Sequence, residues 1–165
     1  MFGADTDVVS YLIRKYSGAA KRTDKEGMTP LHIICDSDGG VDSPIVSGQM
    51  EQIVELLIEA NPEACKKQSN DGATPLLLAV ARNAPLPVLK ALIVANQDPL
   101  SIADKGGRLC LHVAVAVNAT AATFKLLVES YPGGLLIENK DSEIPHAFAA
   151  KMKLDTDKLE LLKPN

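Results

Sequence analysis

The sequence of 165 residues contains no tryptophan, and aromatic residues of all kinds make up only 4% of it. A hydrophobic content of 46% is nevertheless ample for a core, so that core has to be built from Ala, Val, Leu and Ile. Side chains of this kind suit closely packed helices. The length corresponds to about one domain, and no stretch is long and charged enough to indicate disorder.

The sequence also lacks an excess of positive charge, a regular set of cysteines and a long hydrophobic run. Its 17 basic and 21 acidic residues give a formal charge of −4, which disfavours nucleic acid as a partner. The three cysteines, Cys35, Cys65 and Cys110, are odd in number and far apart, which predicts a cytoplasmic or other reducing intracellular compartment. No run reaches the roughly 18–20 apolar residues of a spanning helix, and the start of the chain does not resemble a signal peptide, so we expect no membrane insertion.

Four stretches of the sequence repeat one another, at residues 24–32, 69–77, 104–112 and 139–147. Their turn position holds Gly27, Gly72, Gly107 and Ser142, at spacings of 45, 35 and 35 residues. Upstream of each turn, apolar residues at i, i+3, i+4 and i+7 predict a helix with one buried face. These outer helices are expected at residues 8–15, 51–60, 87–95 and 121–130. Each unit is therefore predicted to be a turn followed by two helices.

The repeated residues have physical reasons for their places. The turn glycines suit a position with positive φ, which Ser142 tolerates less well. Thr29 and Thr74 are placed to cap the helix that follows, and the next residue in each case is a proline, which fits the first turn of a helix. Small residues on the inner helices allow close stacking of neighbouring units, and Asn83 and Asn118 are placed to end two of those helices. The small residues are Ala79, Ala114 and Ala149, whereas the larger Ile34 fills this place in the first full unit, where the interface is expected to be slightly more open or offset.

The segment Thr29-Pro30-Leu31-His32 after a glycine turn, repeated at this spacing, resembles the ankyrin-repeat family, whose period is close to 33 residues. The resemblance covers essentially the whole chain and implies an all-α fold, an ankyrin-type α-solenoid of stacked turn-helix-helix repeats. The chain departs from the motif at several positions. Leu77 replaces the motif His, Leu109-Cys110 replaces Thr-Pro, Ser142 replaces the turn glycine and His146-Ala147 replaces Leu-His.

We expect a single domain over residues 1–165. Its units are an N-terminal half-repeat at 1–20, a repeat at 21–65 with an insertion at 36–48, repeats at 66–100 and 101–135, and a C-terminal capping repeat at 136–165, in which Asp155 caps the last helix. The half-repeat lacks a turn and an inner helix. It suggests either a domain cut from a longer protein or an edge that a partner covers.

No set of residues predicts catalysis, a metal or a cofactor. His32, His112 and His146 lie at or beside the motif position, where the resemblance implies hydrogen bonds to the backbone of the adjacent turn. Cys110 lies near a helix N-terminus, where the pKa of a thiol is lowered, but a small apolar filler is the simpler interpretation and a reactive thiol the alternative. Phosphate-loop motifs are absent. Asp36, Asp38 and Asp42 resemble part of a calcium loop, but the remaining ligands are missing.

The resemblance implies that a partner binds the concave surface formed by the turns and inner helices. Carried onto this chain, the variable positions of that surface are Lys25, Glu26, Met28, Asp36, Ser37, Asn70, Asp71, Ala73, Ala81, Arg82, Lys105, Arg108, Ala116, Val117, Lys140, Asp141, Glu143, Lys151 and Met152. Their charges are mixed in sign, which suits a protein surface better than a phosphate backbone. A second, stepwise surface runs from basic to apolar through Arg22, Lys67, Ile102 and Ile137.

These observations predict a non-enzymatic protein–protein interaction module or scaffold. One variant is an accessory subunit of a multi-subunit complex, held through the N-terminal edge and the insertion at 36–48. The alternatives are a regulatory ankyrin region of a longer enzyme, an enzyme that uses Cys110, and a nucleic-acid binder.

Overall fold

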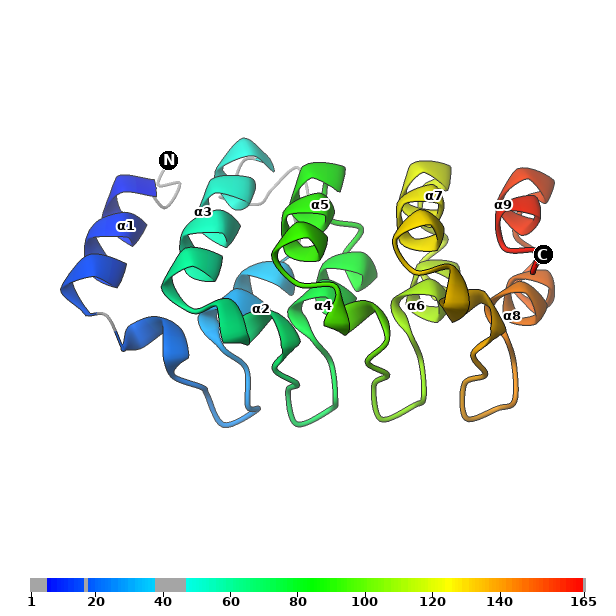
Figure 1. Cartoon of the computed structure of the whole chain (residues 1–165), viewed down its shortest axis with the longest axis horizontal. Coiled ribbons are helices and arrows are strands. Elements are labelled where there is room, and N and C mark those ends of the chain that lie inside the picture. Colours follow the sequence, from blue (N-terminus) through cyan, green and yellow to red (C-terminus); the bar gives the residue numbers. More distant parts are fainter. Residues whose placement is uncertain (1–5, 17, 38–46, 165) are drawn as a thin grey trace.

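The computed structural model describes residues 6–16, 18–37 and 47–164, and within these ranges every regular element is a helix. The helices form two parallel rows that run the length of the molecule (Figure 1). The outer row consists of α1 (Thr6–Lys15), α3 (Ser47–Ala60), α5 (Leu86–Ala95), α7 (Ala121–Ser130) and α9 (Thr156–Leu161). The inner row consists of α2 (Pro30–Cys35), α4 (Pro75–Ala81), α6 (Cys110–Ala116) and α8 (Pro145–Lys151).

Each of the first four outer helices is followed by a short 3-10 turn that leads towards the next loop. These turns are η1 (Ala19–Lys21), η2 (Pro62–Lys66), η3 (Asp98–Leu100) and η4 (Pro132–Leu136). The all-α solenoid expected from the sequence is confirmed, and the predicted outer helices are all present. The largest difference is that α3 begins at Ser47 and not at the predicted residue 51. Its first residues, 47–49, are not hydrophobic, so the spacing of apolar residues did not predict this turn of the helix.

The helix ends follow the predicted capping chemistry. The hydroxyl oxygens of Thr29 and Thr74 accept hydrogen bonds from the backbone N–H groups of His32 and Leu77, and a proline opens each of these helices. Asn83 and Asn118 adopt φ of 51° and 50° just past two inner helices, as predicted.

Asp155 caps the last helix by accepting a hydrogen bond from the N–H of Lys158 at 3.0 Å. This bond stabilises the carboxylate and lowers the pKa of Asp155.

One continuous aliphatic core runs between the two rows. The inner helices α4 and α6 contact each other and carry the fully buried Ala79 and Ala114, and the outer helices α3 and α5 contribute buried branched side chains such as Val54 and Leu92 to the same core. Phe124 is the one aromatic side chain among the largest fully buried residues of the described chain. The aromatic-poor composition therefore reflects helices that stack closely on small residues.

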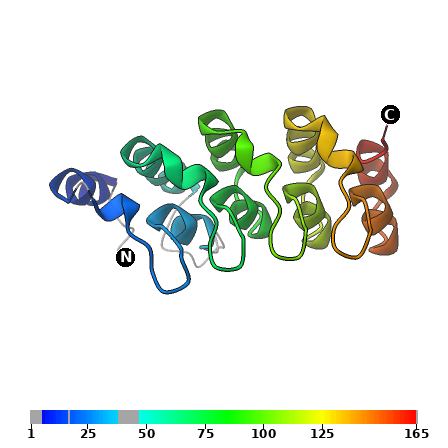
Figure 2. The ribbon, with the colours of Figure 1, turned by 60° about the horizontal axis from the view of Figure 1, so that its bottom comes forward.

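The four turns project side by side from the inner row (Figure 2) and are joined by backbone hydrogen bonds. The N–H of Asn70 donates to the carbonyl of Glu26 at 2.8 Å, and the N–H of Lys105 donates to the carbonyl of Asp71 at 3.1 Å. The third bond, from Lys140 to the carbonyl of Gly106, is also 3.1 Å long. This ladder sets the distance between one unit and the next.

The turn glycines are required by this close approach. Gly72 has φ of +79°, and a Cβ placed on it would lie 2.9 Å from the backbone N of Lys105 in the following turn. Gly107 repeats the situation, with its Cβ position 2.9 Å from the N of Lys140. Ser142 also has positive φ, 58°, but it belongs to the last of the four turns and is exposed. A side chain is therefore sterically tolerated at this turn, whereas at the second and third turns it would clash with the backbone of the following turn.

The insertion predicted at residues 36–48 is described only at its ends. Asp36 and Ser37 follow α2, and α3 begins at Ser47. The calcium-loop interpretation of Asp36, Asp38 and Asp42 depends on residues 38–46, which lie outside the described ranges.

We predict that Gly72→Ala lowers the free energy of unfolding by about 2 kcal/mol or more, because it combines positive φ with a backbone clash. The matched change in the last turn, Ser142→Gly, is expected to raise it by less than about 1 kcal/mol, since relief of strain is partly offset by backbone entropy. Urea denaturation followed by circular dichroism measures both. Equal effects of the two substitutions would contradict the role assigned to the ladder.

Candidate protein-binding groove

The first residue of each turn fixes the turn's shape with its side chain. Asp104 Oδ1 accepts hydrogen bonds from the N–H groups of Gly106 and Arg108, both at 2.8 Å. Asp24 and Asn139 make the same pair of bonds in the first and last turns, and Ser69 accepts one bond, from Ala73, in the second. Short polar side chains stabilise turns in this way. The turn tips are thus held in one conformation before any partner arrives.

The motif histidines tie each unit to the following one. His112 Nε2 donates to the carbonyl of Glu143 at 2.9 Å, and His32 Nε2 donates to the carbonyl of Lys67 at 2.9 Å. Because a carbonyl only accepts, the Nε2 atom carries the proton, and Nδ1 accepts from the backbone N–H of Leu109 or Thr29 at 3.2 Å. Burial lowers the pKa of both histidines and favours the neutral form that these bonds need. The predicted structural role of these two histidines therefore matches the structure.

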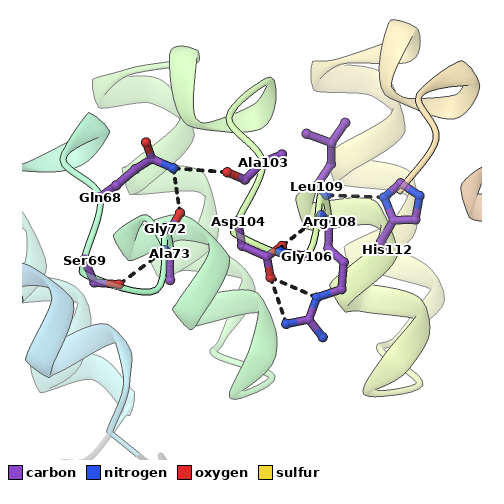
Figure 3. Close-up of polar contacts among 10 residues, drawn as sticks. All are labelled: Gln68, Ser69, Gly72, Ala73, Ala103, Asp104, Gly106, Arg108, Leu109 and His112. Carbon is purple, nitrogen blue, oxygen red and sulfur yellow. Dashed lines mark hydrogen bonds and ion pairs between the residues drawn. The ribbon is translucent and has the colours of Figure 1, made fainter. Parts of the chain in front are cut away.

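The second unit has Leu77 at the histidine position, and a different residue makes the link. The Gln68 side-chain Nε2 donates to the carbonyl of Gly72 at 2.7 Å and to that of Ala103 at 3.0 Å (Figure 3). It therefore joins the second turn to the third, as the histidines do elsewhere. Leu77 itself is buried and faces the groove described below.

The three cysteines are buried and have no disulfide partner. The expected effect of the helix N-terminus on Cys110 is wrong, because Cys110 is 1% exposed and burial raises the pKa of its thiol to about 12. Burial also raises the thiol pKa of Cys35 and Cys65. In this structure Cys110 is the apolar filler of the simpler interpretation.

A groove of about 600 Å³ runs along the inner row across the first three turns. We call it the concave groove. Its floor is aliphatic and is formed by α4 and α6, and its rim is formed by charged residues at the turns and by the ends of the inner helices. The floor residues are Leu77, Leu78, Ala81, Val113, Ala116 and Val117, with Met28 and Ala73 beside them.

Both signs of charge lie on the rim. Asp104 is held by Arg108 through guanidinium contacts of 2.8 Å, and Asp36 pairs with Arg82 at 3.0 Å across the first and second units. Glu26, Asp71 and Lys105 are exposed at the same rim. An apolar floor within a polar rim is the usual arrangement of a protein-recognition surface.

The structure gathers about half of the predicted contact residues around the concave groove. The ten that line it are Glu26, Met28, Asp36, Asp71, Ala73, Ala81, Lys105, Arg108, Ala116 and Val117. The other nine lie outside its lining: Lys25, Ser37, Asn70, Arg82, Lys140, Asp141, Glu143, Lys151 and Met152.

Several of these nine have structural partners. Asn70 Nδ2 donates to the carbonyl of Lys25 at 2.9 Å and Ser37 Oγ donates to that of Ile34 at 2.6 Å. Lys151 pairs with Glu143 at 2.7 Å. The ion pair lowers the pKa of Glu143 and raises that of Lys151. Met152 is 48% exposed beyond the last inner helix.

Sequence reasoning missed six lining residues: Ser69, Leu77, Leu78, Asp104, Gly106 and Val113. Leu77 could have been predicted to contribute to an apolar surface, since it replaces the polar histidine of the motif. Asp104 and Ser69 occupy the first turn position, whose repeated polar character could also have been noted. Leu78 and Val113 are indistinguishable from core residues by pattern.

The stepwise surface predicted from the sequence is mostly present. Arg22 and Lys67 are exposed, Ile137 is 40% exposed and Ile102 is half-buried. The residues two positions before these four lie in the 3-10 turns and are all buried, as expected from their apolar character. They are Ala20, Cys65, Leu100 and Leu135.

Comparison with known families agrees with this geometry. A model of ankyrin repeats in three copies matches residues 45–154, which is about two thirds of the chain. The chain belongs to the ankyrin-repeat family. Ankyrin repeats are typically non-catalytic modules of protein–protein interaction. No curated protein matches the chain.

Two further findings concern the described part of this ankyrin-repeat chain. In it, no group of three or more His, Cys, Asp or Glu residues is placed to hold a metal ion. No helix in the same ranges is both long and apolar enough to cross a membrane.

We predict that Gln68→Ala lowers the free energy of unfolding by about 1 kcal/mol, because it removes two hydrogen bonds near the surface. Adding Leu77→His in the same chain is expected to restore at least half of the loss, since it places an imidazole where the other units have one. Gln52→Ala, at an exposed position of α3, serves as the control. Thermal and urea denaturation test this, and failure of the second substitution to restore stability would contradict the equivalence of Gln68 and the histidines.

Proposed function

We propose that this protein is a non-enzymatic interaction module that binds a segment of another protein in the concave groove. The observation that carries the proposal is the aliphatic floor of α4 and α6 inside a rim of both charges. A partner segment that fits it presents one or two apolar side chains flanked by acidic and basic residues. Such complementarity gives specificity through the rim and affinity through the floor.

The concave groove is preformed. Its rim is held by the turn-to-turn bonds and by the Asp104–Arg108 pair, and its floor belongs to two helices that pack on each other. Binding therefore orders few additional side chains, which keeps the entropy cost of association small. Rigid presentation of a surface is the mechanism we propose.

We predict that Ala116→Glu, which places a carboxylate on the apolar floor, reduces binding of the groove partner by at least about tenfold. Ala122→Glu makes the same change at an exposed position of α7, outside the groove, and is expected to leave binding unchanged. The partner is identified by affinity purification from the native source, and binding is then measured with the purified proteins. Equal binding by the two variants would show that the concave groove is not the recognition surface.

A second candidate function is membership of a larger assembly, and one observation favours it. The helix α1 and the residue that directly follows it expose four large apolar side chains, Val8, Tyr11, Leu12 and Tyr16, each about half exposed. Exposed apolar residues grouped in this way mark interaction sites.

We also propose that the protein works in a reducing compartment, as expected from the cysteines, since all three thiols are unpaired and buried.

We predict that removal of residues 1–20 releases the chain from such an assembly. Size-exclusion chromatography of native extracts, with the full and shortened chains expressed at equal levels, checks this. Unchanged co-elution of the shortened chain with high-mass material would exclude the N-terminal edge as the attachment point.

A further inference from the structure

The helix α1 is equivalent to the other outer helices but is not covered as they are. When the units are aligned on Tyr16, Asn61, Asn96 and Tyr131, three positions of the half-repeat, two in α1 and one in η1, correspond to residues that are buried in every other unit. Val8 corresponds to Ile53, Val88 and Thr123; Leu12 to Leu57, Leu92 and Leu127; Ala19 to Ala64, Pro99 and Gly134. In the half-repeat Val8 is 54% exposed, Leu12 is 47% exposed and Ala19 is also exposed.

The third unit shows what covers these positions. There, Leu127, Tyr131 and Gly134 face Cys110 and Leu111 of the inner helix α6. The contact is close, since a Cβ placed on Gly134 would lie 3.3 Å from Leu111 Cδ1. Leu12 and Ala19, which correspond to Leu127 and Gly134, thus occupy positions that an inner helix covers in the third unit.

In the half-repeat the corresponding residues line an open groove of about 610 Å³. We call it the N-terminal groove, and its residues are Leu12, Lys15, Tyr16, Gly18, Ala19 and Arg22. Figure 1 shows an inner helix beneath α3, α5, α7 and α9, whereas the described chain places none beneath α1. The N-terminal groove therefore has the shape and the apolar lining of an inner-helix position.

The same face carries two of the chain's few aromatic residues. The whole sequence has three Tyr and three Phe, and Tyr11 and Tyr16 are 58% and 56% exposed beside the groove. Lys15 Nζ donates to the Tyr11 hydroxyl at 3.1 Å and lies 5.4 Å and 5.8 Å from the centres of the two rings. Tyrosines are prominent among the residues that dominate binding energy at protein interfaces.

The charged residues that line the N-terminal groove, Lys15 and Arg22, are both cations. Residues 8–22 contain four cations, Arg14, Lys15, Lys21 and Arg22, and no anion. The nearest following acid, Asp24, is engaged by the backbone of its own turn. Carboxylates on a bound segment would therefore meet the positive charges of Lys15 and Arg22, which line the groove.

A second copy of the chain fits the N-terminal groove poorly. A symmetric pair would bring Lys15 and Arg22 of both copies together, and like charges oppose such a contact. A head-to-tail pair would offer α9, whose exposed residues include Asp157 and Glu160, and none of the large apolar side chains that are exposed in the described chain belongs to α9. The far end of the stack is thus a polar cap.

We propose that the N-terminal groove binds a helix of a partner protein, seated as the inner helix of an additional unit. The partner helix carries small and branched aliphatic side chains on the face towards Leu12 and Ala19, and carboxylates at its margins towards Lys15 and Arg22. This inference rests on the proposed membership of a larger assembly and specifies the contact that would hold the chain in it.

Two dye-labelled synthetic peptides test the proposal by fluorescence anisotropy with the full chain. Both have 18 residues and the same leucine and alanine stripe, with glutamates beside the stripe in one and lysines in the other. The glutamate peptide is expected to bind at least about tenfold more tightly at low salt, with the difference shrinking as salt is added. The paired change Lys15→Glu and Arg22→Glu is expected to reverse the preference.

Leu12→Asp places a charge in the N-terminal groove and is expected to weaken the glutamate peptide at least about tenfold. Val94→Asp makes the same kind of change on α5, at a side chain that is 85% exposed, and is expected to change binding less than twofold. Thermal unfolding checks that both variants fold. Absence of binding by both peptides, binding that survives Leu12→Asp, or a chain dimer that Leu12→Asp dissociates in sedimentation equilibrium would each overturn the proposal.

The assembly role has a separate readout, the co-elution of the chain lacking residues 1–20. Loss of co-elution together with absence of peptide binding would overturn the helix as occupant and leave the assembly role in place. Peptide binding with unchanged co-elution would support the helix site and remove the assembly role.

Discussion

The backbone hydrogen bond between consecutive turns is the constraint from which the rest of this structure follows. A carbonyl in one turn and an N–H in the next, 2.8–3.1 Å apart, leave no room for a side chain at the turn position between them. The turn position requires both a positive φ and the absence of a Cβ, and glycine meets both requirements at Gly72 and Gly107. Because the turns stand at a fixed distance, the inner helices that follow them must also stack closely. Ala79 and Ala114 make that stacking possible.

Side-chain links reinforce this spacing, and the chain makes them with more than one residue type. His32 and His112 reach a carbonyl near the next turn from the inner helix, whereas Gln68 reaches one from the segment before its own turn. Each of these units is thus linked to the next by a side-chain hydrogen bond, but the residue that makes the bond differs between units. Where Gln68 has taken it over, Leu77 can be apolar and contribute to the floor of the concave groove. A departure from the family motif has in this way enlarged an apolar surface.

The fold was largely predictable from the sequence because its signals are local and repeated. Thr29 and Thr74 at helix starts, Asn83 and Asn118 at helix ends and the glycine turns each follow from backbone chemistry at a single position. Tertiary packing was harder to predict. The position of Cys110 at a helix start suggested a lowered thiol pKa, but burial between units dominates and raises it. Gln68 lies outside the repeated motif, so its link to Ala103 appears only when two units are side by side. Leu78 and Val113 line the concave groove although their pattern is that of core residues.

Ser142 makes the two ends of the described stack different in whether a further unit could pack on them. Every turn that is followed by another carries a glycine, while the fourth turn carries a Cβ on the side where a fifth would have to approach. A unit duplicated beyond this turn could not settle at the ladder distance until the serine was replaced. At the opposite end, α1 already presents the aliphatic surface on which an inner helix packs. Lengthening of this solenoid, by duplication or by design, is therefore sterically open at one end and blocked by a single side chain at the other.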